Sequence, residues 1–205
     1  MSRFTWLLDP GHGGMIDGVY QTKGKRSPAF NDGVVLYEGE LNRAITNNII
    51  ELASVTDIEV IDIVDSQEDV PLRERVHRAN KLHKEKRNCI YVSIHANAYG
   101  NGHDFNDAKG ASVFHHVRSS KGKVIAESLQ DWIIKFTPFK DRGTKANESW
   151  ANFYVLRKTN MPAVLSENGF MTNKRDATLL LSETIRKMIA AAHFAMIQGI
   201  EKNGF

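Results

Sequence analysis

Four side chains, two histidines and two glutamates, have the types and positions that metal-dependent hydrolysis requires. His12, His95 and Glu167 each lie at or just after the end of a short apolar run, and Glu38 begins a helical pattern after a long loop. The carboxyl ends of parallel strands share one edge of a sheet, where ligands bind. Two imidazoles and one carboxylate can hold a catalytic zinc ion and leave a position for water, and a further carboxylate can move protons. We therefore predict one site at that edge.

Each of these residues alone also has an ordinary structural explanation. His12 could be incidental to a glycine-rich turn, His95 could be a hydrogen-bonded residue of a strand, and Glu38 could simply complement a helix dipole. Glu167 is harder to explain, because burying a carboxylate without a partner is costly. One shared site explains the four better than four coincidences.

Short apolar runs alternate with helical patterns along the chain, which is typical of a mostly parallel sheet with helices on both faces. The runs that predict strands are 4–9, 58–64, 89–95, 111–117, 153–156 and 163–168. The helical faces begin near Leu41, Pro71, Ile125 and Ile185. The length of 205 residues suits a single α/β domain. Segments 13–37 and 99–110 fit no element, and we expect these loops to wall a groove.

The composition excludes several other classes of protein. The formal net charge is only +3, and no Lys/Arg cluster with interleaved aromatics indicates a nucleic-acid partner. No apolar stretch is long enough to predict a membrane span. The single cysteine, Cys89, excludes an intrachain disulfide and a cysteine-based zinc site. The first residues lack signal-peptide features, so we expect release by lysis, export by another route, or a leader outside this sequence.

Four ordered blocks of the chain resemble the zinc-dependent N-acetylmuramoyl-L-alanine amidases of type 3. The blocks are Leu8-Asp9-Pro10-Gly11-His12-Gly13-Gly14, Glu38-Gly39-Glu40-Leu41-Asn42, residues 72–80 with Ser93-Ile94-His95-Ala96-Asn97-Ala98, and residues 153–157 with 162–173. The resemblance implies a twisted sheet of about six strands with one zinc ion at its edge. It implies His12, Glu38 and His95 as zinc ligands and Glu167 as the catalytic residue. This sequence departs from the family in its longer interval between the first two ligands, in an expanded 99–110 loop, and in Gly39, where Lys is usual.

The resemblance also implies a mechanism and a substrate, peptidoglycan. Zinc would lower the pKa of its water to about 7, and Glu167 would move that proton to the departing L-alanine nitrogen. Asp9 and Asn97 are candidates for orienting the histidines, although hydrogen bonding within their turns explains them equally well. We expect residues 1–205 to form one catalytic domain without a separate wall-binding module, to act as a monomer, and to act on the wall in the periplasm or outside the cell.

Two other functions remain open from the residues alone. A different zinc peptidase acting on wall peptides would release amines within the stem or bridge instead of at the sugar. A wall-binding module without activity would bind peptidoglycan but release no product, and such a module has no need of Glu167.

Overall fold

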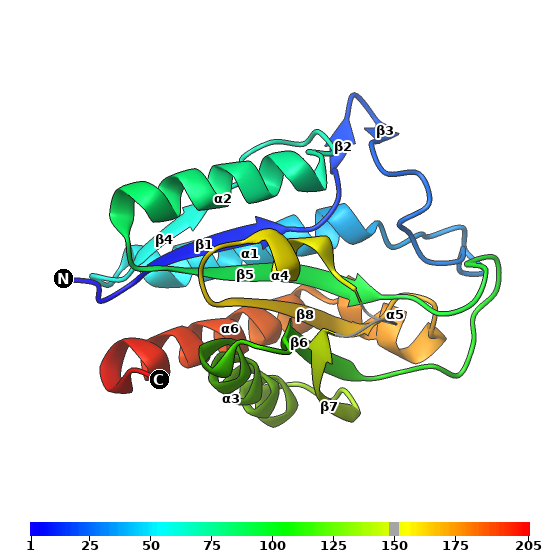
Figure 1. Ribbon diagram of the computed structural model, residues 1–205. Coiled ribbons are helices and arrows are strands. Elements are labelled where there is room, and N and C mark those ends of the chain that lie inside the picture. Colours follow the sequence, from blue (N-terminus) through cyan, green and yellow to red (C-terminus); the bar gives the residue numbers. More distant parts are fainter. Residues whose placement is uncertain (148–151) are drawn as a thin grey trace.

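Six strands form one twisted, mostly parallel sheet in the computed structural model, which describes residues 1–147 and 152–205 (Figure 1). In spatial order the strands are β4 (Glu59–Asp62), β1 (Thr5–Pro10), β5 (Cys89–Asn97), β8 (Ala163–Phe170), β6 (Ala111–His116) and β7 (Asp141–Asn147). Every pairing is parallel except the one between β8 and β6. The predicted single α/β domain with a mostly parallel sheet of about six strands is confirmed.

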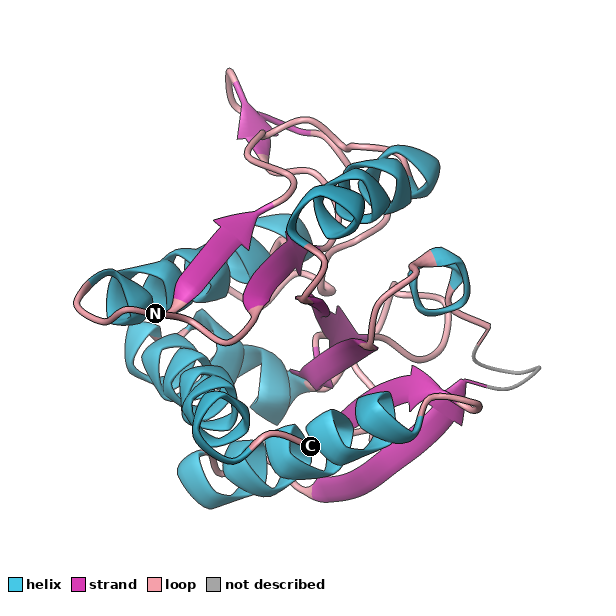
Figure 2. Ribbon diagram, turned by 60° about the vertical axis from the view of Figure 1, so that its left-hand side comes forward, coloured by secondary structure: helices cyan, strands magenta, loops and turns pink. Residues whose placement is uncertain are grey.

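Helices cover both faces of this sheet, as predicted (Figure 2). One face carries α1 (Glu38–Ser54), α3 (Ser120–Phe136), α5 (Lys174–Leu181) and α6 (Glu183–Asn203). The other carries α2 (Leu72–Lys86) and the short α4 (Tyr154–Lys158). None of the helices in the described residues is long and apolar enough to cross a membrane.

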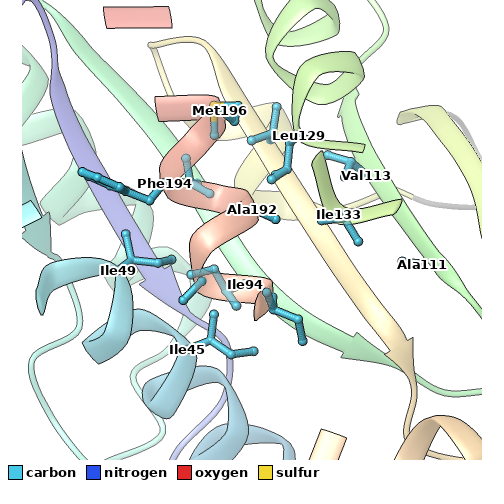
Figure 3. Packing of buried hydrophobic residues seen from close by; sticks show 14 of the residues in the cluster. Ile45, Ile49, Ile94, Ala111, Val113, Leu129, Ile133, Ala192, Phe194 and Met196 are labelled. Atoms are coloured by element: carbon cyan, nitrogen blue, oxygen red, sulfur yellow. The ribbon is translucent and has the colours of Figure 1, made fainter. Parts of the chain in front are cut away.

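The strands are held by two apolar cores, because side chains alternate between the two faces along each strand. On β5, Ile94 packs with α1 and α6, whereas Tyr91 packs on the opposite face under α2. Figure 3 shows Ala192 and Met196 of α6 within the larger of the two cores. Burying each large apolar side chain contributes about 1.5–3 kcal/mol. The central strands are therefore a firm base for whatever their ends carry.

The predicted strand 153–156 is wrong. This segment starts the helix α4, in which Val155 and Leu156 are both buried in the core beneath α2. An apolar run of four residues has no periodicity that separates a strand from a buried helical turn. The sixth strand is instead β7, which no apolar pattern in the sequence predicts. Its polar sequence, Asp141-Arg-Gly-Thr-Lys-Ala-Asn147, lies on the edge of the sheet and is only partly buried.

The two predicted loops contact each other. Segment 13–37 contains only the small hairpin of β2 (Met15–Ile16) and β3 (Val19–Tyr20), and segment 99–110 has neither helix nor strand. The ring centroids of Phe30 and Phe105 are 4.9 Å apart, which joins one loop to the other. Both loops leave the sheet at the edge where its parallel strands end.

Candidate metal centre and active site

His12, Glu38 and His95 come together at the carboxyl edge of the sheet, and one donor atom from each lies within 4.8 Å of the others. Glu38 stands between the two imidazoles. Its Oε2 is 3.2 Å from Nε2 of His12, and its Oε1 is 3.1 Å from Nδ1 of His95. The two rings lie nearly perpendicular, with centroids 5.1 Å apart. The predicted ligand set is therefore one compact group of donors.

His12 is held in a backbone conformation that non-glycine residues seldom adopt, with φ of +65°. Two arginines fix its carbonyl oxygen: Nη1 of Arg43 donates at 2.9 Å and Nη2 of Arg75 at 3.1 Å. Both arginine side chains are buried, and each also donates to other backbone carbonyls of the surrounding loops. These fixed hydrogen bonds offset the cost of the left-handed turn and aim the imidazole at Glu38.

The ring of His95 packs directly against the backbone of Gly11. A Cβ atom at Gly11 would lie only 2.1 Å from Cε1 of His95, so the backbone of the turn passes directly against the ring. Gly11 also donates from its N–H to the carbonyl of Ile94 at 3.0 Å, which ties the turn to β5. The glycine is needed here for close approach, because no larger side chain would leave room for the imidazole.

Glu38 is the first residue of α1 and is buried, with only 2% of its surface exposed. The pairing of β5 with β8 is irregular between His95 and Asn97, and within this irregularity the N–H of Ala96 donates to Oε1 of Glu38 at 3.2 Å. The next residue, Gly39, faces the backbone carbonyl of Gly13, which a Cβ atom would approach to 1.8 Å. This crowding leaves no room for a side chain at position 39.

A buried chain of hydrogen bonds leads from His95 to Asp9. Nε2 of His95 is 3.1 Å from Oγ of Ser93, and Ser93 is 2.7 Å from Oδ2 of Asp9. Tyr91 donates to the same carboxylate oxygen at 2.6 Å, and Arg75 forms an ion pair with Oδ1. If Nε2 carries the proton and donates to Ser93, Nδ1 is free to face Glu38. Asp9 therefore contacts the histidine through Ser93 and not directly.

Burial opposes ionisation of Asp9, but the Arg75 guanidinium and the hydroxyl groups of Tyr91 and Ser93 outweigh it and lower the pKa of the carboxyl. Asp9 thus stays an anion that accepts hydrogen bonds. Asn97 plays no comparable part: its Oδ1 accepts from the N–H of Ala98 at 2.8 Å, a bond within its own turn. Of the two residues considered for orienting the histidines, only Asp9 is connected to one of them by the described hydrogen bonds.

Glu167 lies beside His95, because the two residues are register partners on the parallel strands β5 and β8. Both line a cavity of about 270 Å³, together with His12 and Glu38. Among the described residues, Oε2 of Glu167 is buried without a hydrogen-bond partner. Burial raises the pKa of this carboxyl to about 7, against a smaller lowering influence of His95. Glu167 can therefore gain or lose a proton near neutral pH.

The donor set suits a zinc ion, which takes histidine nitrogen and carboxylate oxygen in catalytic sites. Burial lowers the pKa of His12 and so favours the neutral imidazole that binds metals. Burial also opposes protonation of His95, but the Glu38 carboxylate outweighs it and raises the pKa of that ring. Burial would raise the pKa of Glu38, yet the hydrogen bonds from the two histidines lower it strongly. Glu38 is therefore an anion that lies between the two imidazoles, and its carboxylate would attract a cation.

Several residues that build this site were not among the predicted site residues. Ser93 and Tyr91 lie in the apolar run that predicts β5, and Arg43 occupies a helix that the sequence shows only by its apolar face. One feature of the sequence does indicate Tyr91 and Ser93: side chains alternate along a strand, so these two residues share a face of β5 with His95. Nothing in the sequence indicates that the two buried arginines converge on the carbonyl oxygen of His12.

The chain belongs to the N-acetylmuramoyl-L-alanine amidase family, which it matches over residues 7–199. It is 32% identical to the N-acetylmuramoyl-L-alanine amidase CwlM of Bacillus licheniformis over 187 residues, and 32% identical to an endolysin of Bacillus phage SPP1 over 200 residues. These matches cover 91% and 94% of this chain but 64% of each relative. The type 3 resemblance seen in the sequence is thus confirmed, and the chain spans somewhat under two thirds of these relatives.

Solved structures agree with this assignment. An N-acetylmuramoyl-L-alanine amidase from Clostridium difficile 630 superposes with a TM-score of 0.81 at 27% identity, and the match covers all of both chains. The amidase AmiC2 of Nostoc punctiforme superposes with a TM-score of 0.74 at 27% identity, covering 96% of each chain. The sheet order and helical layers described above are therefore those of this family of amidases.

Proposed function

We propose that the chain is a zinc-dependent hydrolase that cleaves the amide bond between N-acetylmuramic acid and L-alanine in peptidoglycan. The observation that carries the proposal is the placement of Glu167 beside the cluster of His12, Glu38 and His95 in one cavity. Family membership supports the reaction, and the printed names of the relatives describe the same amidase activity.

His12, Glu38 and His95, which all line the cavity, would hold the zinc ion. Bound there, the metal would supply Lewis-acid activation of water and of the scissile carbonyl. Ser93 would keep the proton of His95 on Nε2, so that Nδ1 presents its lone pair to the metal. Arg43 and Arg75 would keep His12 in place through its carbonyl oxygen.

Glu167 would move the proton. Its carboxylate would accept a proton from the attacking water and then donate it to the alanine nitrogen, because an amine leaves poorly without a proton. A buried carboxyl with a pKa of about 7 can do both near neutral pH, and its Oε2 has no described partner that would compete for the proton. Metal ligation is assigned to Glu38 because, within residues 1–147 and 152–205, it is the one carboxylate that lies between the two histidines.

The catalytic unit, its location and its substrate groove are also part of the proposal. Residues 1–205 would act as the catalytic unit, as a monomer, on cell walls in the periplasm or outside the cell. Segments 13–37 and 99–110 would wall the groove that receives the polymer, which their contact through Phe30 and Phe105 supports.

Digestion of purified peptidoglycan, followed by mass spectrometry of the fragments, tests the reaction. An amidase releases intact stem peptides that begin with a free L-alanine amine and leaves sugar chains without peptides. New amines within the stem or bridge would instead identify a zinc endopeptidase, and binding without any product would identify a wall-binding module. Protein purified without added metal should contain about one zinc per chain, and removal of the zinc with a chelator should stop product release.

A further inference from the structure

Lys25 is a feature of the active-site cavity that the proposed mechanism does not use. Among the described residues, it is the only lysine or arginine that lines the cavity containing Glu167. A second hollow of about 570 Å³, which also reaches His12 and His95, is lined by Lys25 as well. The side chain therefore borders both spaces beside the candidate metal ligands.

The backbone of Lys25 is fixed to the start of α1. Its carbonyl oxygen accepts from the N–H of Glu38 at 3.0 Å and from the hydroxyl of Tyr20 at 2.9 Å. The same hydroxyl accepts from the N–H of Gly39 at 2.8 Å. Lys25 thus belongs to a loop of irregular structure, but one hydrogen bond ties its backbone directly to the candidate metal ligand Glu38, and Tyr20 connects it to the neighbouring Gly39.

In the part of the chain that the structure describes, the ammonium group of Lys25 is left available to an incoming group. No carboxylate of the described residues forms an ion pair with it, and the side chain is exposed. Its charge nevertheless reaches the reacting centre, since it lowers the pKa values of both His12 and Glu167. The cavity therefore has a cation that can serve an anionic group of whatever enters it.

We propose that Lys25 binds the free α-carboxylate of the second residue of the stem peptide and makes the enzyme prefer this carboxylate over its amide. The inference rests on the proposed function. In peptidoglycan the residue after L-alanine is D-glutamate joined through its side-chain carboxyl, so its α-carboxyl is left either free or amidated. One residue spans at most about 3.6 Å, so this group lies within one or two residue lengths of the scissile amide. A lysine ammonium attracts a carboxylate as a point charge and gains much less from a neutral amide.

Two soluble muramyl-peptide fragments that differ only at this group, one with the carboxylate and one with the amide, test the proposal through kcat/KM. The unmodified enzyme should favour the carboxylate by about tenfold to a hundredfold, the range expected of one charged hydrogen bond. Lys25→Met should lose most of this preference by losing activity on the carboxylate substrate alone, and Lys25→Arg should retain part of it. Lys84→Met, at an exposed lysine near the end of α2 that lines neither space, should leave both rates unchanged.

The outcomes separate this inference from the function on which it rests. Equal losses on both substrates in Lys25→Met, or an unaltered ratio, would overturn the role of Lys25 while leaving the amidase activity established. An unmodified enzyme that cleaves both substrates equally well would overturn it too. If the unmodified enzyme frees no alanine amine from either substrate, the proposed function itself fails, and the inference fails with it.

Discussion

The two sides of the candidate metal centre are positioned by different forces. His95 and Glu167 are register partners on β5 and β8, which are buried between two layers of helices. His12 lies on a left-handed turn just beyond β1, and two buried arginines hold its carbonyl oxygen in place. One side thus depends on apolar burial and the other on hydrogen bonds to a loop. Removing a buried hydrogen-bond partner on the strand side should therefore lower stability as well as metal binding, whereas removing the His12 side chain on the loop side should weaken metal binding with little loss of stability.

Removing one histidine from each side is the strongest way to test this difference. His12→Ala and His95→Ala each delete one donor of the cluster, so both should lose zinc and measurable activity. In metal-free protein, His95→Ala should also cost about 1–3 kcal/mol of stability, because it leaves Ser93 with one buried partner fewer. His12→Ala should keep the fold with little change, since the arginines bond its backbone. Elemental analysis and thermal unfolding would measure both effects. Equal losses of stability, or zinc retained in either variant, would contradict the comparison.

Glu167→Gln separates the chemistry of the strand side from its structure. The substitution keeps the shape of the side chain but removes the base, so turnover should fall by about 10²–10⁴-fold while zinc content stays near one per chain. Activity assays and elemental analysis of the same preparation would measure the two quantities. Loss of zinc would mean that Glu167 is a ligand and that Glu38 was misassigned. Full turnover with zinc bound would mean that the proposed mechanism is wrong.

The sequence predicts the strand side of this site better than the loop side. Apolar runs ending in His95 and Glu167 place both residues at one edge of a parallel sheet, because strand periodicity and the shared edge are local and general rules. The conformation of His12 depends on Arg43 and Arg75, which converge from different helices, and no local pattern encodes that convergence. The strand β7 was missed for a related reason: an exposed edge strand has no apolar periodicity to reveal it.

Ser93→Ala should sharpen the comparison by loosening His95 without removing it. The variant breaks the chain from His95 to Asp9, so we expect zinc affinity to fall by about 10–100-fold. Competition with a chelator of known affinity would measure this. Ser166→Ala is a matched control, because Ser166 is equally buried on β8 and its hydroxyl bonds His193, Asn168 and the backbone carbonyl of Ser93, but not the side chain of a candidate ligand. The control should lower stability and leave zinc affinity unchanged. Equal zinc affinities in the two variants would show that Ser93 does not orient His95 for metal binding.

The smallest expected effect is a pH dependence of stability that arises from Glu167 in metal-free protein. Burial raises the pKa of this carboxyl to about 7 from its ordinary value of 4.5. Between these two pH values the unfolded chain binds fewer protons at this position than the folded chain, so the contribution of Glu167 to the free energy of unfolding falls as pH rises.

The variant Glu167→Gln lacks this titration. Its Tm should match the parent near pH 4, exceed it by several degrees at pH 7, and keep that lead above pH 7. Thermal unfolding of both proteins across this range would measure the gap. Adding zinc should narrow it, because a nearby cation favours the ionised carboxylate. A gap that stays constant from pH 4 to pH 8 would show that the pKa of Glu167 is the same in the folded and the unfolded chain, near its ordinary value of 4.5, and that the strand side keeps no proton ready for transfer near neutral pH.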